Sequence, residues 1–118
     1  MSKKVSGMLL DVAWDYLDLG QDIEDKQQLL FGAVSAWNIA CMPPGQRIAA
    51  LREFMQEYER MNQAQSAQDF RDVEENMRLL MERKRELYPD VRVQIIGARV
   101  EDREGQLYVE VATVREAT

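Results

Sequence analysis

The chain has 118 residues, of which 46% are hydrophobic and 31% are charged, and its formal net charge is −6. This length and composition fit one globular domain and exclude a disordered or fibrous protein. The negative charge disfavours nonspecific binding to nucleic acid or to anionic membranes, because both depend on a positive surface.

The sequence lacks the residues on which most common catalytic sites depend. It contains no histidine, and Cys41 is its single cysteine, which excludes zinc sites of cysteine and histidine and any triad with histidine. The six glycines are scattered singly, and none forms a phosphate-binding loop. We predict no catalytic residue, no metal site and no cofactor. A chain without an internal disulfide, whose first apolar run is too short for a signal peptide, is expected in the cytoplasm.

The stretch from Leu29 to Met42 is the most apolar part of the chain. Its only polar residues are Ser35 and Asn38, so a helix here has no hydrophilic face. The stretch is too short to span a membrane, and we expect no membrane association. It must therefore be wrapped by other elements of the chain or by a second copy. Asn38 should bond a backbone group where helices meet.

The spacing of apolar residues predicts four amphipathic helices, over residues 6–19, 23–42, 44–61 and 67–87. Ser6, Asp22 and Ser66 are the expected N-caps of the first, second and fourth helices. Pro43 and Pro44 end the second helix and open the third.

The fourth helix is expected to bury a stripe that ends at Leu87. Its charged residues, among them Lys84, are assigned to the solvated side.

After Pro89 the period changes, and two strands are predicted, over residues 91–101 and 106–115. A bulge at Ile95 and Ile96 keeps the apolar residues on one face. A turn over residues 102–105 would pair Val100 with Leu107. The expected fold class is α+β, with a four-helix bundle-like N-terminal part and a C-terminal antiparallel β-hairpin packed on the helices, in a single domain over residues 1–118.

The edge of the first strand, over residues 91–96, carries no proline and could accept another strand. We predict a homodimer in which strands pair across a twofold axis. The candidate dimer or partner interface contains Val91, Val93, Ile95, Arg99 and Tyr108, and Arg99 is expected opposite Tyr108. The alternative is a monomer whose edge is covered by the amino-terminal segment or protected by charges.

Two other functions deserve a test. Carboxylates on the second and fourth helices could hold Mg²⁺ or Mn²⁺ for a hydrolase, although they lie on predicted solvated faces. These residues are Glu24, Asp25, Asp69, Asp72, Glu75 and Glu82.

A basic area could instead bind nucleic acid, although each cation has an acidic neighbour. Its members are Arg78, Arg83, Lys84, Arg85, Arg92, Arg99 and Arg103, with Tyr88 and Tyr108 nearby. The function that we predict first is a small cytoplasmic, non-enzymatic protein-protein interaction or regulatory module that self-associates and binds another protein.

Overall fold

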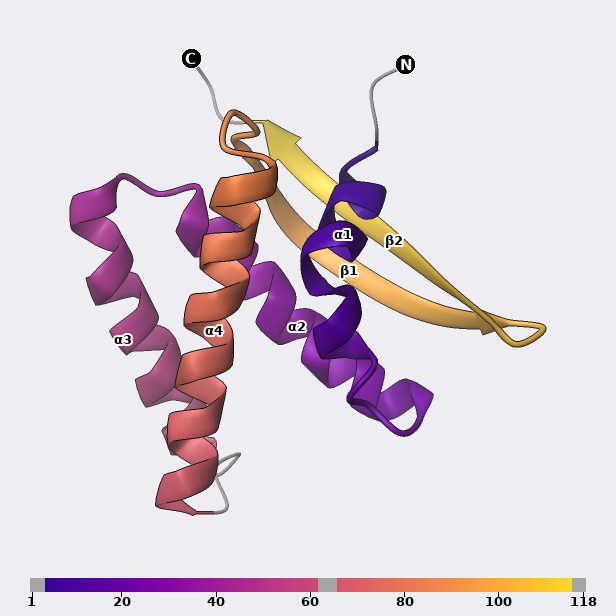
Figure 1. The fold of residues 1–118 in the computed structure, drawn as a ribbon, viewed down its shortest axis with the longest axis horizontal. Coiled ribbons are helices and arrows are strands. Elements are labelled where there is room, and N and C mark those ends of the chain that lie inside the picture. Colours follow the sequence, from indigo (N-terminus) through magenta and orange to yellow (C-terminus); the bar gives the residue numbers. More distant parts are fainter. Residues whose placement is uncertain (1–3, 62–65, 116–118) are drawn as a thin grey trace.

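The computed structural model describes residues 4–61 and 66–115. Within them it has helices α1 (Val5–Leu17), α2 (Ile23–Ala40), α3 (Pro44–Arg60) and α4 (Ala67–Leu87), then strands β1 (Val93–Arg103) and β2 (Gln106–Arg115). The two strands form one antiparallel hairpin, and β1 runs alongside α2 in the opposite direction (Figure 1). The predicted α+β class is confirmed.

Local capping signals place two of the helix starts correctly. The side chain of Asp22 accepts a hydrogen bond from the backbone N–H of Asp25 at 2.8 Å, and Ser66 does the same for Asp69 at 3.0 Å. Ser6 is not an N-cap, because α1 already begins at Val5 and has Lys4 at its cap position without a side-chain bond.

Helix α2 lies at the centre of the core, as its composition requires. Seven of its residues are buried, and Trp37 has no exposed surface. Its cover is nevertheless incomplete, because 57% of Phe31 is exposed. None of the helices in the described part of the chain combines the length and hydropathy of a membrane span.

Helix α4 buries a lysine where the sequence suggested a leucine. Met77, Leu80 and Met81 are buried, but Lys84 is only 2% exposed whereas Leu87, the expected end of the buried stripe, is 48% exposed. The reason is the helical period, since Lys84 follows Met77 by seven residues and Met81 by three and so lies in line with them. The prediction that Lys84 faces solvent is wrong; it was made because the side chain is charged.

Helix α3 is the least embedded of the four helices. Only Leu51 and Met55 are buried in it, and Ile48, one turn before Leu51, is 67% exposed. In Figure 1 α3 stands beside α4, away from the hairpin. The molecule is therefore flat, with extents of 44 × 41 × 21 Å.

The hairpin has the predicted bulge but not the predicted register. The register shifts between Ile95 and Gly97, which confirms the bulge. The predicted pairing of Val100 with Leu107 is wrong, because Val100 lies opposite Val109. Glu104 and Gly105, both with positive φ, make a two-residue turn that is tighter than the four-residue turn expected. The error is two residues, so the face of each side chain is unchanged.

Candidate functional site

Helix α2 hydrogen-bonds the outer edge of β1 with its side chains. The amide of Asn38 accepts from the N–H of Ile95 and donates to the carbonyl of the same residue, both at 2.8 Å. These are the two bonds that a paired residue of a neighbouring strand would make. Asn38 does bond a backbone group, as predicted, but that group belongs to a strand rather than to a helix.

Gln27 repeats this pattern farther along the same strand. Its side-chain oxygen accepts from the N–H of Val100 at 2.9 Å, and its nitrogen donates to the carbonyl of Ala98 at 3.1 Å. Gln27 and Asn38 are about 16 Å apart along the helix axis, and their side chains leave the helix in directions that differ by only about 20° of rotation about that axis. Five residues of strand cover about the same length. The two amides therefore meet successive outward groups of one strand edge.

The start of this edge is covered by Trp37 and Lys84. The indole N–H of Trp37 donates to the carbonyl of Val93 at 2.8 Å. The ammonium of Lys84 donates to the carbonyls of Tyr88 and Val91, at 2.9 and 2.6 Å, and lies 5.1 Å from the centre of the Trp37 ring. Burial lowers the pKa of Lys84. We call the contacts of Gln27, Trp37 and Asn38 with β1, together with those of Lys84 with Tyr88 and Val91 just before β1, the α2–β1 seam.

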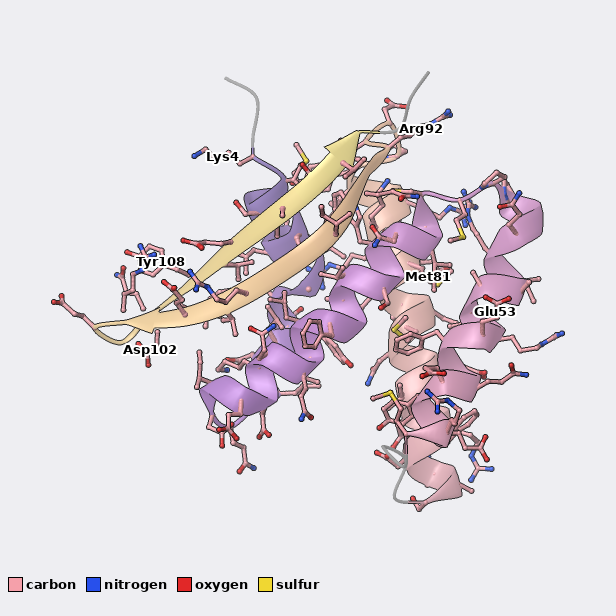
Figure 2. All side chains as sticks on the ribbon, turned by 180° about the vertical axis from the view of Figure 1, so that it is seen from behind. Lys4, Glu53, Met81, Arg92, Asp102 and Tyr108 are labelled. Atoms are coloured by element: carbon pink, nitrogen blue, oxygen red, sulfur yellow. The ribbon has the colours of Figure 1, made fainter. Side chains whose placement is uncertain are left out.

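The predicted interface residues fall into two groups. Val91, Val93 and Ile95 lie in the seam, and their outward carbonyls are hydrogen-bonded within the chain. Arg99 and Tyr108 lie on the outer face of the hairpin, and Figure 2 shows Tyr108 close to the turn. Their role as an interface stays a prediction.

The outer face of the hairpin carries a small network of ion pairs. Arg99 lies opposite Glu110 and pairs with it at 2.8 Å, so the predicted Arg99–Tyr108 opposition is wrong. The guanidinium over the Tyr108 ring is that of Arg103, at 4.8 Å. Arg99 and Arg103 also pair with Glu101, each at 2.7 Å, and the bond from Arg103 lowers the pKa of Glu101.

The outer edge of β2 differs from that of β1. Because Ile95 and Val100 point their backbone groups at α2, the register turns those of Leu107, Val109, Val111 and Thr113 away from β1. No described residue makes a hydrogen bond to these outward groups. Among the described residues, β2 thus has the open strand edge.

The other side of α2 borders an open groove of about 580 Å³. Leu19 after α1, Phe31 of α2 and Met61 after α3 form its rim, and they are 67%, 57% and 57% exposed. Leu29, Phe54 and Val73 continue the apolar wall, and the polar lining includes Gln28, Glu57, Asp69, Asp72 and Asn76. We call this feature the α2 groove.

Two tyrosines and an aspartate form a polar cluster inside the groove. The hydroxyl of Tyr58 donates to a carboxylate oxygen of Asp69 at 3.2 Å. Burial and then the charge of Asp69 raise the pKa of Tyr16, and the same causes raise the pKa of Tyr58 to about 12. A Cβ at Gly32 would lie 3.3 Å from the Tyr16 hydroxyl, so the absence of a side chain there keeps room for it. Both phenols stay protonated at neutral pH.

The residues of the two alternative functions are distributed as follows. The described residues contain no group of three acidic or cysteine side chains close enough to hold a metal ion. Of the predicted basic area, Lys84 is buried, which corrects its expected exposure, whereas Arg78 and Arg83 pair with Glu74 and Asp15. The network on the hairpin takes up Arg99 and Arg103.

The sequence contained partial signals for the residues that it did not single out. Gln27 and Lys84 lie on the same helix faces as buried residues of α2 and α4, and this spacing was the signal that they face the interior. Nothing in the sequence marked Phe31 as exposed, because its neighbours are apolar.

Comparisons with models of known protein families, with curated proteins and with solved structures found no match to this chain.

Proposed function

We propose that the protein is a small, non-enzymatic interaction module of the cytoplasm, which self-associates through the edge of β2 and binds another protein. The observation that carries this proposal is the row of outward backbone groups at Leu107, Val109, Val111 and Thr113, for which no described residue is a partner. An unpaired strand edge of this length is a template for another strand.

A second copy of the chain supplies a matching strand. Antiparallel pairing of two β2 strands about a twofold axis gives a four-stranded sheet with β1 at both ends. The outer edge of β1 is already bonded to α2, so the new sheet would end at satisfied edges. Pairing through β1 would first have to break those bonds, and for this reason we place self-association at β2.

The charges on β2 restrict the register of this pairing. An axis at Glu110 would put two like charges directly opposite each other, which destabilises a sheet. An axis at Val109 or Val111 separates the two glutamates. Tyr108, one of the predicted interface residues, then lies beside the new strand junction.

The test is the molar mass of the protein in solution as a function of concentration. We expect a dimer at micromolar concentration by light scattering. Val111→Pro removes a central outward N–H and should give a monomer, since proline is tolerated at strand edges but donates no bond. Val111→Ala loses more packing but keeps the N–H, so it should remain a dimer.

Circular dichroism shows whether each variant is folded, and Thr113→Pro, at an exposed position, is the second disrupting variant. A wild-type chain that stays monomeric, or folded proline variants that stay dimeric, would contradict the proposal.

A further inference from the structure

The rim of the α2 groove is an apolar surface that no described residue covers. Leu19, Phe31 and Met61 come from three separate parts of the chain and meet at one opening, and each is more than half exposed. Scattered single apolar residues are ordinary on protein surfaces, but a cluster around a groove marks a contact site. The volume of about 580 Å³ also lies within the range of known binding sites.

The charge of the groove selects the occupant. Among the described residues that line it, every ionisable one is acidic or a tyrosine, and none is a lysine or arginine. Asp72 accepts a bond from the neutral amide of Gln68 at 2.8 Å, so this contact leaves its charge in place. Glu57 is paired with Arg60, which lies outside the lining. The carboxylate of Asp72 and the acidic character of the lining therefore favour a cationic ligand.

The shape of the groove favours a helix over a small molecule. Its walls are α1, α2, α3 and α4, and its rim residues remain exposed around the opening, so a ligand enclosed within it would leave them in water. An amphipathic helix lies along such a groove and covers the rim with its own apolar face. Met61 on this rim has a flexible side chain that adapts to a partner.

From these observations we infer that the α2 groove binds a basic amphipathic helix of a partner protein. The helix would place leucine-like side chains on Phe31 and its neighbours and a lysine or arginine near Asp72. This inference rests on the proposed function, because it names the partner class of the interaction module. The groove is formed by helices and contains no residue of β2, so the two contacts are separable.

The probe is a labelled synthetic helix of leucine and lysine with an apolar stripe at three- and four-residue spacing. Fluorescence anisotropy should show saturable binding that weakens as salt is raised. A helix with glutamate in place of lysine should bind at least about tenfold more weakly. A leucine–lysine peptide of scrambled order should lose as much affinity.

Variants locate the site on the protein. Phe31→Gln should weaken binding about tenfold, whereas Ile96→Gln, at a similarly exposed residue of the hairpin, should leave it unchanged. Asp72→Asn should weaken binding about threefold and reduce its salt dependence, and Asp18→Asn, an exposed control outside the groove, should not. Thermal melts confirm that each variant is folded.

The outcomes separate this inference from the proposed self-association. Val111→Pro should bind the peptide as the wild type does, even where it has lost the dimer. No binding of the leucine–lysine helix, equal binding of the glutamate helix, or equal binding by Phe31→Gln would overturn the inference. Each of these results would leave the measured molar mass, and hence the self-association, as it was.

Discussion

The two sides of helix α2 differ in how completely the rest of the chain covers them. Toward β1, Gln27, Trp37 and Asn38 bond the backbone groups of a strand edge, and no buried side-chain nitrogen or oxygen in the described residues lacks a partner. Toward the groove, Phe31 remains 57% exposed. The first side is complete within the chain. The second side has apolar residues like those of a core, but they remain exposed. This difference points to the α2 groove as the surface for another molecule.

The largest effect is expected when an amide is removed from the seam. Asn38→Leu leaves the N–H and the carbonyl of Ile95 without their partners, and the free energy of unfolding should fall by about 2–4 kcal/mol. Urea denaturation followed by circular dichroism measures the change. Asn76→Leu makes the same chemical change on the groove wall and should cost much less. Equal losses in the two variants would remove the distinction between seam and groove.

Neighbouring glutamines of α2 give a matched comparison. Gln27 bonds Ala98 and Val100, whereas Gln28 lines the groove and is exposed. Gln27→Leu should lower the free energy of unfolding by about 1–2 kcal/mol, and Gln28→Leu should change it by less than about 0.5 kcal/mol. Hydrogen exchange at Val100 N–H should be faster in Gln27→Leu alone. If both variants leave this exchange unchanged, Gln27 does not hold the strand edge.

Alkaline pH should act on the two sides with opposite sign. The folded pKa of Lys84 lies below its ordinary 10.5, so the unfolded chain holds more protons and the Lys84 contribution to stability rises as pH approaches that value. The pKa of Tyr58 is raised from 10.0 to about 12, so the unfolded chain deprotonates first and stability falls across that interval. Lys84→Met should remove the rise, and Tyr58→Phe should reduce the fall, with Tyr16 responsible for the remainder.

Melting temperatures between pH 8 and pH 12 test these signs, and absorbance at 295 nm follows the tyrosines directly. A tyrosine titration that is complete near its ordinary pKa would contradict the burial of the Tyr58 hydroxyl beside Asp69.

The smallest effect on stability is expected at the groove rim. Phe31→Gln removes an exposed aromatic ring and should change the free energy of unfolding by less than about 0.5 kcal/mol. Trp37→Phe, six residues farther along the same helix, removes a buried bond to Val93 and should cost about 1–3 kcal/mol. A large loss from Phe31→Gln in thermal melts would mean that the ring belongs to the core.

Much of the fold could be predicted because it depends on neighbours in the chain. Asp22 and Ser66 cap helices through N–H groups three residues away, and Pro43 and Pro44 separate two helices through their own rings. The bulge next to Gly97 follows from the alternation of apolar residues along one strand. Each of these signals acts over a few residues.

The candidate sites could be predicted only in part. The apolar face of the hairpin was correct, but its register was not, because a shift of two residues leaves every face unchanged and only the turn geometry decides. An open strand edge was also expected. Which edge stays open depends on Gln27 and Asn38 reaching residues of β1 that are 71 and 57 positions away in the chain, and no local pattern encodes such contacts.

By itself, the sequence determined the period, the ends and the apolar sides of the helices and strands, because these follow from hydrogen bonds and side-chain directions between near neighbours. Only the tertiary structure decided what lies against each side. It buried Lys84 beneath Trp37, closed the edge of β1 with α2 and left Phe31 at an open groove. The physical reason is that burial depends on elements distant in the chain, so a charged residue can be enclosed and an apolar one left in water.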